Sequence, residues 1–572
     1  MEAGLNFSDL QHIIGVKLCF FGFITMGLLA IYYKWKPWIF LLITGGLCAL
    51  AYYILVDNLW LMFWGLRGDE VTITAMYEMF AHGSLFSDFA YANLPPFYPA
   101  LFFQAFALLG RWFGLNGVQV AKLATASTIL LLPALVYSLQ ELYWKVDKSR
   151  GDKDPGTITY FLSALLMFVV IDWDAIIMKP YELVSAVFVI LWTVFLLHDV
   201  HNKNISWKRI LIYGVTGGIL FLLFYFWFFL AAIGVALFNL FYSQKTTLKK
   251  YGQFALVGLM IIIIGSAYWL PLAISYKAFG AENWQIGFFI IEWIATHGPT
   301  FDFSLRGLIL LGGLVALIAY RKRFYARGLL SLFVASYVWQ AMGMFAILFF
   351  ASPLQESKGF FFFNRVVLVF ALSYGIERLW KWSSIKFEKK LWQKSVMIIG
   401  VLFLSTQLIF GTFTDKKEVM AVRDRARVVS QEMNELISFL NSNYDVYEKK
   451  TLSSGIPELH AFLPLNVVFY FNQHNSHPAA GFSNRVLFLK ELSFVSDSKL
   501  FFENLDNSIF GRIDLFVFEK DGEPGYPIYY ILDNFPYGIE STGLRFGSGV
   551  FVKPYVKKVF ENNKYIVFEN AM

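Results

Sequence analysis

Residues 209–243 read RILIYGVTGGILFLLFYFWFFLAAIGVALFNLFYS, a nearly unbroken apolar run of 35 residues. A membrane-spanning helix needs about 20 apolar residues, because the hydrocarbon core is about 30 Å thick and each helical residue rises about 1.5 Å. The run is therefore too long for one untilted helix. It also holds Gly214, Gly217 and Gly218, and we expect two short helices or a hairpin here.

Apolar blocks of this kind recur from the N-terminus to about residue 413. Hydrophobic residues make up 57% of the chain and charged residues only 16%, whereas a soluble protein has about 25% charged residues. Backbone groups in lipid must be hydrogen-bonded internally, so long apolar runs predict helices. The predicted fold class is a polytopic α-helical membrane protein with about 11–13 crossings. The other candidate spans are 18–33, 38–57, 118–142, 157–173, 182–198, 252–275, 302–320, 328–350, 362–380 and 395–413.

Lysine and arginine predict the orientation of these spans, because basic loops stay on the cytoplasmic side. The basic loops contain Lys34 and Lys36, Lys145–Lys153, Lys203–Arg209, Lys245–Lys250, Arg321–Arg327 and Lys381–Lys394. All can be cytoplasmic if 209–243 crosses twice and 97–113 does not fully cross. The loops 58–117, 174–181, 276–301 and 351–361 then face outward. The net charge of +7 is explained by topology, and nucleic-acid binding is not expected.

The composition changes after Phe413. Residues 414–572 alternate polar and apolar residues and contain no run long enough to span a bilayer. Strands are expected at Asn466–Phe471, Ile513–Phe518 and Gly549–Pro554, and a helix at 418–441. We therefore predict two domains: a membrane domain at 1–413 that includes a catalytic loop at 58–117, and an extracytoplasmic soluble mixed α/β domain at 414–572.

The first external loop contains the best candidates for chemistry. It includes Arg67-Gly68-Asp69-Glu70, and a carboxylate at a membrane surface can act as a general base. Adjacent residues on a helix point about 100° apart, so we expect only one of these two acids to face a substrate. The alternative is structural, with Asp69 capping a helix that starts near Val71.

Other polar residues fall in predicted external segments. In the first loop, Asp88 is followed by a segment from Tyr91 to Pro99 that forms either a turn before a helix or a rigid wall beside a site. Lys179 can bind a lipid-linked phosphate or pair with Glu182. Cations near the leaving phosphate would stabilise its charge, although basic residues beside spans also act as interfacial anchors. The further candidates are Lys358 with Arg365, and Glu292 with His297.

Three stretches together resemble the GT-C superfamily of polyprenyl-phosphate-dependent glycosyltransferases. Within it, the chain is most similar to the actinobacterial galactan arabinofuranosyltransferase family that primes arabinan on cell-wall arabinogalactan. The stretches are Gly68-Asp69-Glu70 with Tyr91-Ala92-Asn93-Leu94-Pro95-Pro96-Phe97-Tyr98-Pro99, then Lys179-Pro180-Tyr181-Glu182, and Asn472-Gln473-His474-Asn475-Ser476-His477-Pro478 with Asn484-Arg485. The chain is rich in Lys, Phe, Ile and Asn, unlike actinobacterial relatives, so the resemblance leaves the donor sugar and the acceptor open.

The resemblance implies inverting transfer of a sugar, arabinofuranose-like, from a polyprenyl-phosphate donor to a cell-surface or cell-wall glycan acceptor. The reaction would take place at the outer face of a bacterial plasma membrane. Asp69 would be the catalytic base with Glu70 beside it. No metal is required by the motifs, although this acidic pair could hold one. Substrate-binding roles are expected for Arg67, Asp88, Tyr91, Asn93, Tyr98, Lys179, Tyr181, Glu182, Lys358, Arg365, His477 and Arg485.

Three other functions fit parts of the pattern. A lipid-linked oligosaccharide polymerase or ligase shares the topology, but such proteins place their chemistry in a large loop between late spans, and the late external loops are short here. A transporter should show internal repeats and charges near mid-membrane, and the acidic motif lies in a loop instead. A membrane scaffold would need no functional Asp69.

Overall fold

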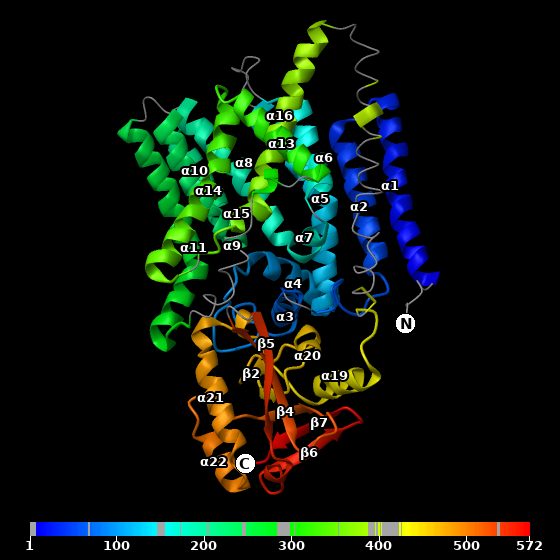
Figure 1. Ribbon diagram of the computed structural model, residues 1–572, viewed down its shortest axis with the longest axis vertical. Helices are drawn as coiled ribbons and strands as arrows, with labels where there is room; N and C mark the ends of the chain where they lie inside the picture. The colour runs from blue at the N-terminus through cyan, green and yellow to red at the C-terminus, as the bar shows by residue number, and fades with distance from the viewer. Residues whose placement is uncertain are drawn as a thin grey trace. The chain divides into compact units, whose positions relative to one another are not determined.

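The structure is a computed structural model, mostly helical, with a sheet in its C-terminal part (Figure 1). It describes residues 7–66, 69–145, 155–171, 173–202, 205–242, 247–282, 298–301, 304–352, 354–386, 395, 398–400, 402, 423–424, 426–534 and 538–572. The chain forms two compact units. The first, called here the helical unit, comprises Met1–Asn58, Ala124–Gly265 and Ile291–Ala421. The second, called the mixed unit, comprises Leu59–Leu123, Ser266–Ile290 and Val422–Met572.

Seven helices in the described part of the chain are long and apolar enough to cross a membrane. Their apolar segments are Leu10–Tyr33, Pro37–Val56, Gly117–Trp144, Pro180–His201, Leu248–Phe279, Phe324–Phe350 and Lys358–Ser383. Other predicted crossings correspond to shorter apolar helices: α6 (Thr157–Val170), α9 (Trp207–Leu223), α10 (Phe226–Tyr242) and α13 (Leu305–Ala319). The predicted span at 395–413 lies almost wholly outside the described residues. The membrane character of the chain therefore rests on seven helices.

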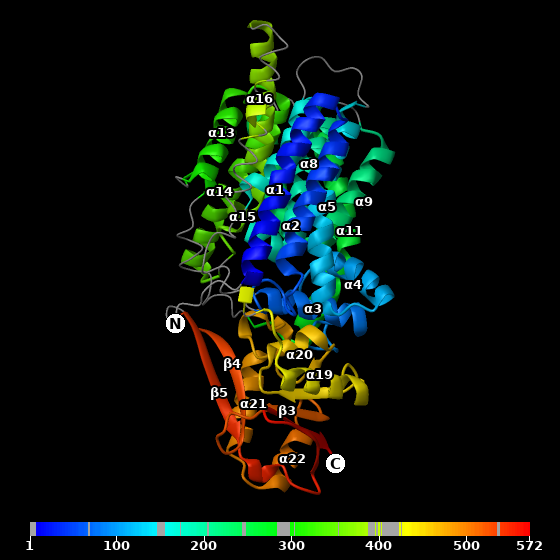
Figure 2. The same cartoon turned by 90° about the vertical axis from the view of Figure 1, so that its right-hand side faces the viewer.

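Neighbouring helices pack side by side within the helical unit. In both views α1 (Phe7–Tyr33) lies along α2 (Pro37–Val56) (Figures 1 and 2). Two other close pairs are α10 with α14 (Phe324–Phe350), and α13 with α16 (Phe363–Lys386). The short helix α15 (Lys358–Phe361) precedes α16 and packs on it. The remaining helices of this unit include α7 (Trp173–Met178) and α8 (Pro180–Asn202).

The run at 209–243 forms two helices, as expected, with α9 ending at Leu223 and α10 starting at Phe226. The glycines do not make this break. They lie inside α9, where an added Cβ on Gly214 would come within 2.6 Å of Met260 and one on Gly218 within 2.6 Å of Ile264. Both neighbours belong to α11 (Leu248–Phe279). Small residues at a helix interface allow close backbone approach in membrane proteins, so these glycines fix the packing of α9 on α11.

The C-terminal part of the mixed unit combines helices with a five-stranded sheet of order β2-β1-β3-β7-β6. Strand β1 is parallel to β2 and β3, whereas β7 is antiparallel to β3 and β6. The strands are β1 (Lys450–Ser453), β2 (Asn466–Val467), β3 (Leu515–Glu519), β6 (Val556–Glu561) and β7 (Tyr565–Asn570), and the helices are α19 (Gln431–Asn443), α20 (Pro457–Phe462), α21 (Phe482–Ser493) and α22 (Ser498–Asp506). The predicted mixture of helices and strands is confirmed, although Gly549–Pro554 is no strand, because a 3-10 turn at Ser548–Val550 precedes β6.

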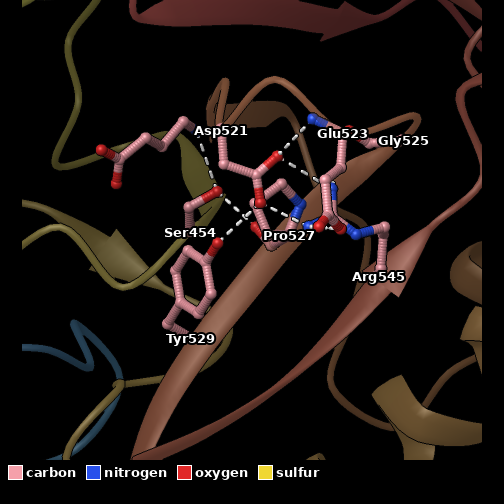
Figure 3. Close-up of polar contacts among 8 residues, drawn as sticks. Ser454, Asp521, Glu523, Gly525, Pro527, Tyr529 and Arg545 are labelled. Carbon is pink, nitrogen blue, oxygen red and sulfur yellow. Dashed lines mark hydrogen bonds and ion pairs between the residues drawn. The ribbon is translucent and has the colours of Figure 1, made fainter.

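Strands β4 (Tyr526–Asn534) and β5 (Gly538–Phe546) form a separate antiparallel ribbon, visible as the long hairpin in Figure 2. A polar network fastens one end of it (Figure 3). Both carboxylate oxygens of Asp521 accept from Arg545, and Tyr529 Oη donates to Oδ2 at 2.8 Å. Ser454 Oγ donates to the Pro527 carbonyl. The Arg545 guanidinium lowers the pKa of Asp521, and the network links the ribbon to the residue that follows β1.

The mixed unit also contains the first loop of the sequence. Its helices are α3 (Asp69–His82) and α4 (Leu101–Phe113), and the start of α5 (Gly117–Lys145) follows. The sequence predicted a linear division at residues 413 and 414, which lie outside the described residues. The structure instead groups 59–123 with 422–572.

Candidate functional site

The acidic pair lies at the start of α3, where negative charge is stabilised by the helix dipole. Asp69 is partly exposed, whereas Glu70 is fully buried. Glu70 Oε2 accepts the Trp64 backbone N–H at 2.8 Å and so ties the preceding turn to the helix. Burial raises the pKa of Glu70 well above its ordinary value. Of the two carboxylates, only Asp69 is therefore partly exposed, while Glu70 has a structural position.

Asp88 organises the middle of the first loop. Its side chain is 1% exposed, and Oδ1 accepts the backbone N–H groups of Ala90 at 3.0 Å and Tyr91 at 3.3 Å. The loop closes through a bond from the Asp88 N–H to the Leu94 carbonyl. Burial raises the pKa of the Asp88 carboxyl to about 7, although the surrounding amides lower it. These contacts give Asp88 a positioning role in the loop.

Tyr91 docks the first loop on the C-terminal segment. Its hydroxyl lies 3.1 Å from Ser476 Oγ and accepts the Tyr470 backbone N–H at 3.1 Å. Two bonds at β2 reinforce the contact: the Val467 N–H donates to the Ala90 carbonyl at 2.8 Å, and the Ala92 N–H to Asn466 Oδ1 at 3.3 Å. Residues 374 to 385 positions apart in sequence are thus joined within one unit.

Arg485 and His477 support this docking. The Arg485 guanidinium lies between the rings of Tyr91 and Phe510, at 5.0 and 4.6 Å from their centroids, and it donates to the carbonyls of Ala480 and Val468. His477 is buried, and burial lowers its pKa to about 4. The sequence placed Tyr91, His477 and Arg485 in substrate binding. The structure brings Tyr91 and Arg485 into contact and buries His477, whose Nδ1 accepts the Ala479 N–H.

A buried polar cluster surrounds Tyr470. Its ring packs edge-on against His460 at 5.1 Å, and its hydroxyl faces that of Thr72 on α3 without a well-formed hydrogen bond. Among the described residues, four buried polar atoms of this cluster have no hydrogen-bond partner: Thr72 Oγ1, Asp88 Oδ2, His460 Nδ1 and Tyr470 Oη. Such atoms are scarce in folded proteins and are usually satisfied by bound water or a ligand.

A second constellation lies in the helical unit. Lys358 Nζ on α15 is 2.8 Å from Glu182 Oε1 on α8, and both side chains are buried. Lys179 Nζ lies 3.9 Å from the same oxygen, and Tyr181 Oη donates to it at 3.4 Å. The Trp227 indole N–H donates to the Glu182 carbonyl at 3.0 Å. Two ammonium groups around one carboxylate leave a net positive charge.

The other predicted residues are placed as follows. Arg365 on α16 is close enough to Arg306 on α13 for their charges to interact, which adds to the cationic character of the helical unit. Asn93 is exposed, and the Tyr98 ring lies 5.1 Å from that of Phe97. Arg67, Glu292 and His297 lie outside the described residues.

Sequence reasoning missed Glu78, which is buried on α3. Its Oε2 accepts the Gly117 N–H at 2.6 Å and so caps the start of α5, while Oε1 contacts His82 at 3.0 Å. An acid in an otherwise apolar helix was the available signal. Tyr470 and His460 carried no such signal, because isolated aromatic residues in an apolar segment are ordinary core residues.

No protein-family model matches the chain, and a comparison with curated proteins finds no similar sequence. The reading of the site therefore rests on its residues and their geometry.

Proposed function

We propose that this protein is an inverting membrane glycosyltransferase of the GT-C type. It takes a sugar from a polyprenyl-phosphate donor and transfers it to a cell-surface glycan at the outer face of a bacterial membrane. The observation that carries the proposal is the unequal environment of the acidic pair. One carboxylate, Asp69, is partly exposed at the start of α3, and its neighbour Glu70 is buried.

Asp69 acts as the general base. Its carboxylate takes the proton of the acceptor hydroxyl while the hydroxyl oxygen bonds to the anomeric carbon. The bond from that carbon to the phosphate oxygen breaks, and its electron pair stays on the departing polyprenyl phosphate. Attack opposite to the leaving group inverts the anomeric configuration. Glu70 holds the turn before α3 and takes no proton in this scheme.

The cations of the helical unit stabilise the leaving phosphate. Lys179, Lys358 and Arg365 come from segments far apart in sequence, and the two lysines share the Glu182 carboxylate. Positive charge held in a poorly solvated region stabilises developing negative charge strongly. The lysine pair and Arg365 are therefore the proposed donor-binding groups, and Glu182 keeps the lysines in place.

The contacts described above change some of the expected roles. Asp88, Tyr91, His477 and Arg485 become positioning residues, because their polar atoms bind other groups of the protein. Asp88 does so within the first loop, Tyr91 reaches Ser476, and His477 and Arg485 bind within the C-terminal segment. By resemblance, the donor sugar is arabinofuranose-like, and exposed first-loop residues such as Asn93 are proposed to contact the substrates.

The test uses purified protein in detergent with a panel of radiolabelled polyprenyl-phosphate sugars and glycan acceptors. Wild type is expected to release polyprenyl phosphate from one donor. Asp69→Asn should lower the rate by about 10²–10⁴-fold, as expected for loss of a general base. Glu70→Gln is the matched control, because its amide oxygen still accepts the Trp64 N–H, and it should remain active.

Two results would overturn the proposal. Full activity of Asp69→Asn, in a variant with the melting temperature of wild type, would show that Asp69 is not the general base. Failure to consume any monosaccharide donor, combined with consumption of a lipid-linked oligosaccharide, would favour a polymerase or ligase.

A further inference from the structure

Four segments of the mixed unit meet at the Tyr470 side chain. The Tyr470 ring packs edge-on against His460 of α20 and against Phe89 of the first loop, with a centroid distance of 5.1 Å in each case. Helix α20 also packs on α3, and the Tyr470 hydroxyl faces Thr72 of that helix. Asp88, the neighbour of Phe89, is close enough for its charge to affect the Tyr470 phenol. Each segment thus contributes one polar side chain to the same interior region.

These four side chains are enclosed by protein. Thr72 is 3% exposed, Asp88 1%, His460 2% and Tyr470 0%. Each nevertheless has a polar atom without a hydrogen-bond partner among the described residues. Buried polar atoms are costly when they are unpaired, and folded proteins usually satisfy them. Because so little of the four side chains reaches the surface, only a very small molecule can serve as their common partner.

The chemistry of the four atoms selects this molecule. The hydroxyls of Thr72 and Tyr470 can each donate and accept a hydrogen bond. Burial raises the pKa of the Tyr470 phenol and lowers that of His460 to about 3, so the phenol keeps its proton and the imidazole is neutral. Nδ1 of a neutral imidazole donates or accepts according to its tautomer. An inorganic cation would bind only the acceptors of this mixed set, and an anion only its donors, whereas water both donates and accepts.

From these observations we propose that Thr72, Asp88, His460 and Tyr470 form an enclosed binding site for ordered water. A buried water molecule typically makes about three hydrogen bonds to polar groups that lack other partners, and this set supplies them. The water joins α3, the first loop, α20 and the segment after β2 through one hydrogen-bonded centre. The inference goes beyond the proposed function, because it concerns the interior of the mixed unit whatever reaction takes place at Asp69.

The site also bears on the position of the acidic pair. Thr72 follows Asp69 by three residues, so both lie in the first turn of α3. The Thr74 hydroxyl, two residues further on, donates to the Glu70 carbonyl of its own helix at 2.7 Å. Thr72 differs because its hydroxyl is available to the other segments. The water site therefore fastens the first turn of α3 to the C-terminal segment.

The experiment uses X-ray-generated hydroxyl radicals on the full chain in nanodiscs, with oxidised side chains located by mass spectrometry. The radicals form from water where it stands, so a buried ring is oxidised only when water is held beside it. Tyr470 and His460 are the probes. Phe516 and Phe518, each 0% exposed in the core of the same unit, are the dry references, and Tyr529, 40% exposed, reports bulk solvent. Rapid mixing with ¹⁸O-labelled water before irradiation measures how fast the water at each ring exchanges.

Tyr470 should be oxidised several-fold more than Phe516 and Phe518, and its label should acquire ¹⁸O more slowly than that of Tyr529. Oxidation of Tyr470 no greater than that of the two phenylalanines would show a dry interior. Exchange as fast as at Tyr529 would show that bulk solvent enters the region. Either result overturns the inference.

A matched pair of variants on α3 locates the water. Thr72→Val has nearly the same shape but removes one hydroxyl from the site, and it should lower the oxidation of Tyr470 several-fold. Thr74→Val removes a hydroxyl that is bonded within α3, and it should leave the oxidation of Tyr470 at the wild-type level. Equal oxidation of Tyr470 in the two variants would contradict the assigned site. None of these readouts depends on catalysis, so the proposed function is tested separately.

Discussion

Two adjacent carboxylates at the start of α3 have opposite environments because a helix turns by about 100° per residue. Asp69 is directed toward the surface, and Glu70 into the interior against the Trp64 amide. Burial raises the pKa of Glu70 well above its ordinary value, which disfavours a second negative charge beside the proposed base.

Asp88 should make the stability of the mixed unit depend on pH. In the unfolded chain its pKa is 3.8, and burial raises the folded pKa to about 7. Between these values only the folded state binds the proton, so stability is highest below pH 4 and falls as pH rises through 7. The shift corresponds to at most about 4 kcal/mol, at about 1.36 kcal/mol per pKa unit.

Asp88→Asn removes this dependence, because the amide oxygen still accepts the Ala90 and Tyr91 N–H groups but does not titrate. Thermal unfolding of the detergent-solubilised protein between pH 5 and 8 checks this. Wild type should lose stability across the range more steeply than the variant. Parallel curves would contradict the assigned environment of Asp88.

Tyr91→Phe should loosen the contact between the first loop and the C-terminal segment. The variant leaves the buried Tyr470 N–H without its acceptor, which costs about 1–3 kcal/mol. Faster hydrogen exchange at residues 88–94 and 468–476 is the expected result. Tyr529→Phe is the matched control, since it removes a hydroxyl from a partly exposed residue of the same unit. Equal exchange in both variants would show that the Tyr91 hydroxyl carries no docking role.

At the scale of elements, α15 meets α8 through one ion pair. The Lys358–Glu182 contact joins a helix of four residues to one of 23, and the Phe224 ring lies 5.6 Å from the ammonium group. A buried ion pair adds little net stability, but removal of one partner is costly. The pair therefore fixes which side of α15 faces α8.

Variants of the Lys358–Glu182 pair should differ in stability. Lys358→Met leaves Glu182 with Lys179 nearby, whereas Glu182→Gln leaves two lysines without their shared carboxylate, so the second variant should be less stable. Loss of one partner costs about 3–5 kcal/mol in a buried pair. Melting temperatures of both single variants and the double variant check this, and the double variant should recover part of the loss. Additive losses would show that the two side chains are not coupled.

At the scale of the molecule, the chain builds one compact unit from distant segments. Residues 59–123 precede most membrane-spanning helices, and 422–572 follow them, yet both belong to the mixed unit. They must then lie on the same side of the membrane. Basic loops predict that this side is extracytoplasmic.

Labelling of intact cells with a membrane-impermeant maleimide tests the topology. In a background without Cys19 and Cys48, Ile509→Cys should react in intact cells. Lys322→Cys, in the basic turn between α13 and α14, should react only after lysis. The reverse pattern would invert the topology and exclude an outer-face reaction at Asp69.

Several features could be predicted from sequence because they depend on local chemistry. Long apolar runs specify helices in lipid whatever their partners, and the break in 209–243 follows from its length. The acidic start of α3 could likewise be recognised locally. The prediction of a strand at Gly549–Pro554 was wrong because alternation of polar and apolar residues does not distinguish a strand from a turn of similar composition.

The sequence by itself determined that the chain enters membranes, where most helices lie, and which acidic pair starts α3. Only the tertiary structure decided that Glu70 is buried, that Tyr91 binds Ser476 and that Lys358 meets Glu182. Those contacts join residues up to 385 positions apart, and periodicity along a segment determines which face is buried without specifying what covers it. Partner choice depends on packing between segments, and that information is present only in the folded chain.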